Sequence, residues 1–381
     1  MSRYHSYLNS AEKLIHNYKG DVPFSIFIKQ FFAANKQMGS RDRKAISQLC
    51  YQVFRLGHFL KSEPAFKRII EAAVIFAEQN AEFLKALDID TGNEKQALDE
   101  GSLDEVFPFA VMLSEQVDKP AFQQSILQQP DLFLRIRPGA KDKVLQALET
   151  NSVPFKLLSE NSVSVPTGTD VAAFLPLNRW AVIQDWSSQK TGEIMAEIFN
   201  QHQFKPDKIW DCCAASGGKS IMLHDLFPEA RLTATDVRES ILGNLQTRFE
   251  QAGIKRYETF VADLTLKQQR MLGSPFDLVI ADLPCTGSGT WARTPENLVF
   301  FEKEMAADYA SRQYAIANEA LRWLRPQGYF VYITCSVFAE ENEKVVEKLL
   351  GSGSLKLHRQ QLIPGWHQHA DSMFIAVMQK A

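Results

Sequence analysis

Apolar residues recur at three- and four-residue spacing through the first third of the chain, which is the spacing of one buried helix face. The pattern is clearest over residues 24–37, 43–61 and 72–87. Because no β-like alternation interrupts these segments, we expect an all-helical module over residues 1–125.

Beyond this region the pattern shortens to β-like runs broken by Pro, Gly and Asn. The sequence predicts strands and one helix in the order 132–137, helix 140–151, 154–158, 162–166 and 180–185. A small α/β module over residues 126–185 fits this order.

From residue 186 strand and helix patterns alternate regularly to the C-terminus. Strands are predicted at 208–212, 231–236, 259–263, 276–282 and 329–335, and helices at 219–227, 238–253 and 302–324. This alternation predicts an α/β fold with a mostly parallel, doubly wound sheet over residues 186–381. In such sheets ligands bind beyond the carboxyl ends of the strands.

Composition changes this picture little. The chain has 381 residues, of which 45% are hydrophobic and 23% charged, and a net charge of −3. No run of 18 apolar residues and no secretory leader appear, so we expect a cytoplasmic protein without a membrane span. Residues 1–70 carry 12 basic against 4 acidic side chains and residues 71–120 carry 3 against 12, which would confine any polyanion contact to particular faces or simply give two solvated surfaces.

The five cysteines, Cys50, Cys212, Cys213, Cys285 and Cys335, do not form the pattern of a disulfide framework. There is no Cys-x-x-Cys pair and no histidine cluster, so no metal site is expected. Reduced thiols are therefore predicted.

The stretch WDCCAASGGKS, residues 210–220, ends like a phosphate-binding P-loop. A P-loop requires a Gly separated by four residues from the Gly-Lys-Ser triplet, and this position is Cys213. The stretch instead predicts a strand, a turn of small residues and a helix whose first amides can meet a ligand.

Aspartates follow the next strands. Asp236 ends the strand after this turn, where a nucleoside ribose would present its hydroxyls, and Asp263 is placed to accept from an adenine amino group. Each alone could equally be a helix cap or turn residue. Their recurrence at successive strand ends, together with Asp282, favours a shared ligand site.

Two cysteines stand at equivalent strand ends. Cys285 follows Asp282 in ADLPCTGSGTW, and Cys335 ends the strand YFVYITC. A single cysteine on an apolar strand is usually a small core residue. Both of these enter polar or glycine-rich turns, where a thiol can reach a ligand.

The segments CAASGGKS, ADLPCTGSGTWARTPE and YITCSVFAEENE resemble the signature motifs of the RNA cytosine-5 methyltransferases of the Sun/RsmB-like group. The resemblance extends to VIQDWSSQ and SRQYAIANEALRWLRPQG, and more weakly to SRDRKAISQLCYQVFRLG, which is similar to a NusB-like RNA-binding module. It implies a Rossmann-like methyltransferase domain over 186–381 that uses S-adenosylmethionine, preceded by a helical RNA-binding module and a small RNA-positioning module.

Cytosine carbon 5 is a poor nucleophile until a thiolate adds to carbon 6. The resemblance implies that Cys335 is this nucleophile, that Cys285 assists product release and that Asp282 faces the base. The DNA cytosine methyltransferases use the Pro-Cys cysteine instead, which makes Cys285 the rival nucleophile; the Thr-Cys-Ser motif favours Cys335.

The same resemblance implies a cofactor pocket. It would be lined by Cys213, Ala214, Ala215, Ser216, Gly217, Gly218 and Lys219, with Asp236, Asp263 and Asp282. Arg293 is a candidate for a substrate phosphate or for a structural pair. The family usually has Pro at the position of Ser216 and Asp-Gly-Phe-Phe where this chain has Asp371–Phe374.

The expected partner is RNA, with ribosomal RNA first and transfer RNA as the alternative substrate, and a monomer is expected. An RNA-binding ribosome-assembly factor with little or no methyl transfer is a second hypothesis. An enzyme acting on DNA or a small molecule is a third, disfavoured by the Thr-Cys-Ser motif and the basic N-terminal helices.

Overall fold

The structure is a computed structural model that describes residues 3–89, 98–267 and 275–381. Its helices are α1 (Arg3–Asn17), α2 (Phe24–Ala34), α3 (Ser40–Arg55), α4 (Ala65–Ile75), α5 (Ala77–Ala86), α6 (Glu100–Val106), α7 (Lys119–Ile126), α8 (Lys141–Thr150), α9 (Trp186–Gln201), α10 (Gly218–Leu226), α11 (Glu239–Ala252), α12 (Glu296–Phe300), α13 (Glu304–Leu321) and α14 (Glu343–Leu350). Its strands are β1 (Leu132–Ile136), β2 (Lys156–Ser159), β3 (Ser162–Val165), β4 (Ala181–Ile183), β5 (Lys208–Asp211), β6 (Arg231–Asp236), β7 (Tyr257–Val261), β8 (Phe276–Asp282), β9 (Leu324–Thr334), β10 (Leu355–Ile363) and β11 (Met373–Lys380).

The chain divides into two compact units. The first comprises Met1–Val111, Asp118–Gln129 and Trp291–Glu302, and the second comprises Met112–Val117, Pro130–Thr290 and Lys303–Ala381. The first unit is helical throughout its described part and takes in a short segment from the distant 291–302 region. The second unit holds both sheets.

The helical unit is built on the apolar stripes that the sequence pattern predicts. Ala11, Ile28, Leu49, Val53 and Ile69 are all buried in one hydrophobic cluster. These residues come from α1, α2, α3 and α4, so each helix contributes one face to the same core.

The first sheet of the second unit is small and antiparallel, in the order β2-β3-β1-β4. Val144 and Leu148 of α8 pack with Leu134 and Val163 of the strands in a separate cluster. The predicted order of strands and helix between 132 and 185 thus forms one small layer of sheet covered by one helix.

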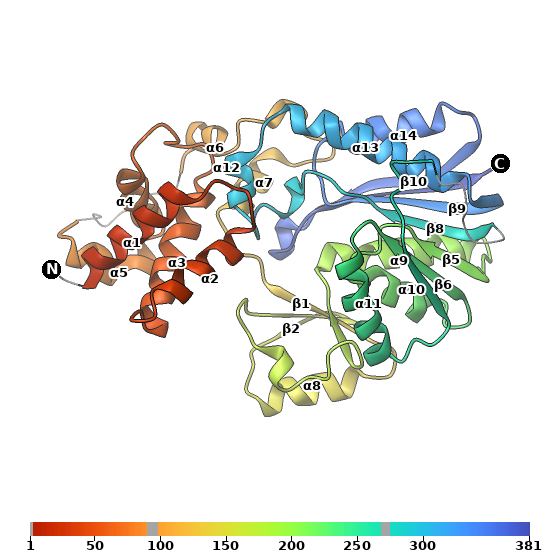
Figure 1. The fold of residues 1–381 in the computed structure, drawn as a ribbon, viewed down its shortest axis with the longest axis horizontal. Coiled ribbons are helices and arrows are strands. Elements are labelled where there is room, and N and C mark those ends of the chain that lie inside the picture. The colour runs from red at the N-terminus through yellow and green to blue at the C-terminus, as the bar shows by residue number, and fades with distance from the viewer. Residues whose placement is uncertain (1–2, 90–97, 268–274) are drawn as a thin grey trace. The chain divides into compact units, whose positions relative to one another are not determined.

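The second sheet has seven strands in the order β10-β11-β9-β8-β5-β6-β7. Strands β5 to β9 pair in parallel, while β11 runs antiparallel to both of its neighbours. Figure 1 shows α13 and α14 on one face of this sheet and α9, α10 and α11 on the other. The predicted fold class, a mostly parallel and doubly wound α/β sheet, is confirmed.

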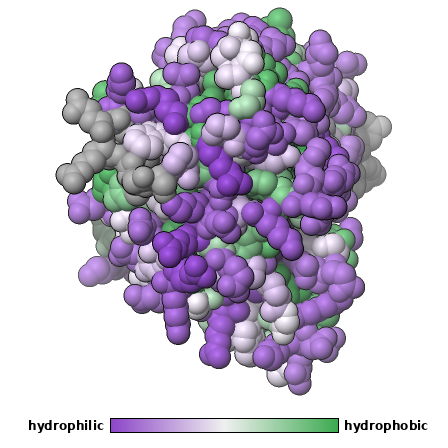
Figure 2. Space-filling view, turned by 90° about the vertical axis from the view of Figure 1, so that its right-hand side faces the viewer, coloured by the Kyte–Doolittle hydropathy of each residue, from purple (hydrophilic) through white to green (hydrophobic). Residues whose placement is uncertain are grey.

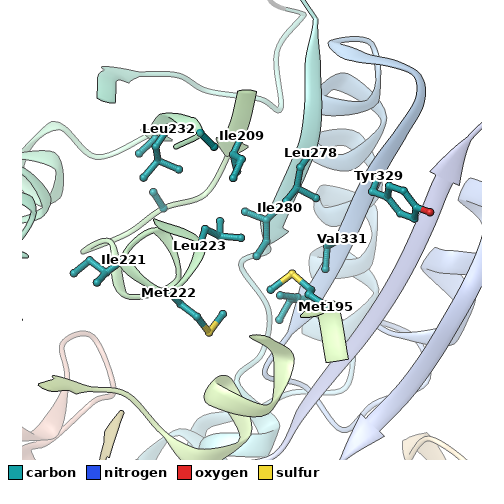
Figure 3. Packing of buried hydrophobic residues seen from close by; sticks show 14 of the residues in the cluster. Met195, Ile209, Ile221, Met222, Leu223, Leu232, Leu278, Ile280, Tyr329 and Val331 are labelled. Carbon is teal, nitrogen blue, oxygen red and sulfur yellow. The ribbon is translucent and has the colours of Figure 1, made fainter. Parts of the chain in front are cut away.

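The core of this sheet lies against α9 and α10. Figure 3 shows Met195 beside Ile280 and Val331, with Ile209 and Leu278 further along the strands, and all five side chains are buried. Continuous apolar strands are expected where helices cover both faces.

Some elements extend beyond what the pattern predicts. The sequence does not single out β10, β11, α1 or α9, and β9 begins at Leu324 rather than at residue 329. Across the described parts of the chain, no helix combines the length and apolar character needed to cross a membrane. Hydrophilic residues cover most of the face drawn in Figure 2.

Candidate active site

The strand order reverses between β5 and β8. From β5 the chain proceeds through β6 to β7 at one edge and then returns to the other side of β5 with β8. Such a reversal opens a crevice at the carboxyl ends of the two central strands. Here those ends are Asp211 and Asp282.

The predicted ligand turn follows β5. Ala215 and Gly217 have positive φ angles of 46° and 83°, so the chain reverses sharply before α10 begins at Gly218. Arg248 of α11, which the sequence analysis does not identify, donates to the Ser216 hydroxyl at 2.8 Å and to its carbonyl at 2.9 Å. The serine that replaces the usual proline is therefore tied to the neighbouring helix.

Asp236, at the end of β6, lies beside this turn. Its carboxylate accepts from the Ala215 amide at 3.0 Å and from the Arg238 guanidinium at 2.9 Å and 3.2 Å. Burial alone would raise the pKa of Asp236, but the hydrogen bonds from Arg238 and Ala215 outweigh it and lower the pKa below its usual range. Asp236 is therefore ionised, and both of its carboxylate oxygens accept from Arg238.

The ion pair of Lys219 and Asp282 joins α10 to the end of β8. The Lys219 ammonium donates to Asp282 at 2.7 Å, with 10% of the lysine side chain and 32% of the aspartate side chain exposed. Asp211 lies below them, fully buried, and one of its oxygens accepts from the Ser220 hydroxyl at 2.6 Å. Burial raises the pKa of Asp211 to about 7.

Asp263 lies in the turn after β7, which ends at Val261. Asp263 accepts from the amide and hydroxyl of Thr265 at 3.0 Å and 2.6 Å, the bonding of a turn residue, and these bonds lower its pKa. Cys213 is half-buried, whereas its neighbour Cys212 is buried in the sheet and has a pKa raised by burial.

The two cysteines of the predicted motifs meet. The Sγ atoms of Cys285 and Cys335 are 3.2 Å apart, although the residues are 50 positions apart in the chain, and both are half-buried. The hydrogen bond with Cys335 and burial raise the pKa of Cys285 well above its usual value. Cys285 therefore keeps its proton at neutral pH.

Backbone contacts hold the loop that carries Cys285. The Gly289 amide donates to the Cys335 carbonyl at 2.9 Å, and the Ser372 amide donates to the Gly289 carbonyl at 2.8 Å. A side chain at Gly289 would overlap the Ser372 carbonyl, since an added Cβ would lie 2.2 Å from it. The segment Asp371–Phe374 thus packs directly behind the cysteine pair.

Arg293 is half-buried in Trp291–Glu302, in the helical unit. Glu341, which sequence reasoning did not single out, is completely buried and bonds the residues that follow both cysteines. Among the residues that the structure describes, no group of three or more His, Cys, Asp or Glu side chains could hold a metal ion.

Comparison with known proteins finds similarity to methyltransferases. Residues 200–379 match the family described as 16S rRNA methyltransferase RsmB/F. The chain is 28% identical over 239 residues to ribosomal RNA small subunit methyltransferase B of Shewanella oneidensis, covering 61% of this chain and 54% of that protein. The protein of the same name in Xylella fastidiosa is 32% identical over 168 residues, covering 44% and 37%. The chain thus spans about half the length of the curated relatives it matches.

Solved structures share the fold. The crystal structure of PH0851 superposes with a TM-score of 0.73 at 17% identity, covering 100% of this chain and 99% of that one. NSun6 from Pyrococcus horikoshii with SFG superposes with a TM-score of 0.57 at 15% identity, covering 69% and 94%.

Proposed function

From the match of residues 200–379 to the family described as 16S rRNA methyltransferase RsmB/F, we propose that the protein methylates carbon 5 of cytosine in ribosomal RNA. The observation that carries the proposal is the 3.2 Å approach of Cys285 and Cys335. Both thiols follow strands whose carboxyl ends lie at one edge of the sheet, next to the reversal of strand order between β5 and β8. Two half-buried thiols at this edge of the sheet can reach a substrate and react with it, whereas two cysteines buried in the core cannot.

The residues at this edge fit S-adenosylmethionine as the cofactor. Asp211 has a buried carboxyl oxygen without a hydrogen-bond partner, an added Cβ at Gly218 would meet nothing within 4 Å, and Lys219 and Asp282 border the same turn. Cys213 to Lys219 would hold the methionine end, and Asp236 and Asp263 the nucleoside. Arg238, whose side chain is 58% exposed, can leave Asp236 to a ribose. When bound, the cofactor supplies an electrophilic methyl group.

Cys335 would act as the nucleophile, and Cys285 would assist product release. Cys335 adds as a thiolate to carbon 6, which makes carbon 5 nucleophilic, and Asp282 holds the base at its ring nitrogen. The neutral Cys285 thiol donates a hydrogen bond to the Cys335 sulfur. Once carbon 5 carries the methyl group, a base removes the carbon 5 proton, the bond between carbon 6 and the Cys335 sulfur breaks, and the thiolate leaves. The hydrogen bond from Cys285 stabilises the departing sulfur, so loss of Cys285 slows release.

The remaining parts would bind the RNA. We assign residues 1–125 to a helical, NusB-like RNA-binding module and residues 126–185 to a small RNA-positioning module. A target cytosine must leave its stack to reach the sheet edge, and this costs least in unpaired RNA.

Two cysteine substitutions test the chemistry. Cys335→Ala should abolish methyl transfer to ribosomal RNA, whereas Cys285→Ala should accumulate a protein–RNA adduct that survives denaturation in gel electrophoresis. Cys50→Ala, which removes a buried thiol of the helical unit, serves as the control for loss of a cysteine. Full turnover in Cys335→Ala would refute the nucleophile assignment, and transfer to transfer RNA but not to ribosomal RNA would correct the substrate.

A further inference from the structure

Each cysteine of the pair is followed by a hydroxyl residue, and both hydroxyls bond the same carboxylate. Thr286 follows Cys285 and donates its hydroxyl to Glu341 Oε2 at 2.5 Å. Ser336 follows Cys335 and donates its hydroxyl to the same oxygen at 2.5 Å. One carboxylate therefore joins the two loops that carry the thiols.

The other oxygen of Glu341 strengthens this connection. Oε1 accepts from the Thr286 amide at 2.8 Å and from the Gln313 side-chain amide at 3.0 Å. Gln313 also donates to the Pro284 carbonyl at 3.0 Å. The backbone on both sides of Cys285 is thus bonded to Glu341 directly or through α13.

Burial and a backbone hydrogen bond hold Glu341 in place. Its side chain is fully buried, and the Tyr332 hydroxyl donates to its backbone carbonyl. Burial raises the pKa of Glu341, while its hydrogen bonds from Ser336 and Thr286 oppose this. Four donors compensate the burial of this carboxylate. Removing the carboxylate would cost free energy of folding, because each of the four donors would be left without a partner.

We propose that Glu341 is a positioning residue whose carboxylate fixes the separation of the Cys285 and Cys335 thiols by binding Thr286 and Ser336. Four hydrogen bonds converge on it from the two loops and from α13, and no contact of Glu341 with either sulfur is needed. Its contribution to catalysis rests on the proposed function, but its control of the thiol geometry does not.

The test is the reactivity of Cys285 in the full-length protein without RNA. The thiol–thiol hydrogen bond raises the pKa of Cys285, and the Glu341 charge adds to this. Iodoacetamide alkylates only the thiolate, so the pH dependence of alkylation at Cys285, measured by mass spectrometry, reports this pKa. In Glu341→Gln the pH midpoint should fall by roughly one unit or more.

Ser336→Ala separates position from charge. It removes the hydrogen bond between the Cys335 loop and the Glu341 carboxylate and keeps that carboxylate, so a fall of the midpoint in this variant comes from displaced thiols. Tyr309 and Tyr332, two further titratable side chains whose charges interact with that of Cys285, are unchanged in both variants. Glu340→Gln, which removes an exposed partner of Lys344 one residue away, is the matched control and should behave as wild type.

An unchanged midpoint in folded Ser336→Ala would overturn the positioning role, even if Glu341→Gln shifts it. Methyl transfer provides a second readout: kcat should fall by about 10- to 100-fold in Glu341→Gln with unchanged binding of S-adenosylmethionine. If the wild-type protein transfers no methyl group, the proposed function fails, while the alkylation profiles still decide the role of Glu341.

Discussion

Asp211 shows how a single buried carboxyl group can make stability depend on pH. It is fully buried at the end of β5, and its pKa is raised from 3.8 to about 7. Between pH 4 and 7 the folded state keeps a proton that the unfolded chain releases. The contribution of this group to the free energy of unfolding therefore falls as pH rises through that range and is constant above it.

Asp211→Asn removes the titration and nearly preserves the shape. Relative to wild type, the variant should gain stability from pH 4 to pH 7, by up to about 4 kcal/mol. Urea denaturation at a series of pH values measures the difference. The asparagine amide does not titrate, so its own effect on the free energy of unfolding is the same at every pH.

The control is Asp207→Asn, which alters an exposed carboxylate just before the same strand. The stability difference of this control should vary little over the range. A difference that is equally flat for Asp211→Asn would show that the buried carboxyl does not titrate in this window.

At the scale of an element, the turn before α10 depends on its first glycine. Gly217 has a φ of 83°, and an added Cβ would lie 2.9 Å from Phe249 and 3.0 Å from Leu245 of α11. Gly217→Ala should lower the free energy of unfolding by about 1–3 kcal/mol, from backbone strain and overlap together.

Gly218 is a matched control because it is adjacent in the chain but conformationally ordinary. An added Cβ there would meet nothing within 4 Å. Gly218→Ala should leave the free energy of unfolding unchanged or raise it by about 0.5 kcal/mol. Equal losses in both variants, measured by denaturation, would contradict the role assigned to Gly217.

The periodic elements were predictable because burial on two faces produces continuous apolar strands between amphipathic helices. Strands β5, β6 and β8 and helix α10 lie where the pattern indicates. The family resemblance, read from three short motifs, is likewise confirmed by the match over residues 200–379. Strand β10 escaped prediction because its mixed pattern, LKLHRQQLI, is typical of a half-buried strand beside a single neighbour.

Contacts between distant side chains were not predictable in the same way. The sequence indicates that Cys285 and Cys335 end neighbouring strands, but it does not indicate that Glu341 joins the residues after them. The repeated Cys-Thr and Cys-Ser pairs were a possible signal. Arg238 and Arg248 gave none, since an arginine near a turn is ordinarily a solvated side chain.

At the scale of the whole molecule, the helical unit is assembled from three separate parts of the chain, and Arg55 joins them. Its guanidinium, from α3, donates to the carbonyls of Ile126, Gln128 and Ala292 at 2.8, 2.9 and 2.7 Å. Burial lowers the pKa of Arg55 to about 10, so it remains charged at neutral pH.

Arg55→Met keeps an unbranched side chain but removes the guanidinium, which leaves these buried carbonyls without donors. The helical unit should lose about 3 kcal/mol or more. Hydrogen exchange should accelerate most at the backbone amides of Trp291–Glu302 and Asp118–Gln129, because these segments lose a bond to α3. Arg41→Met, at an exposed position of the same helix, should leave exchange unchanged. Uniform acceleration across α1 to α5, with no excess in the two joined segments, would mean that Arg55 stabilises α3 rather than the assembly of the unit.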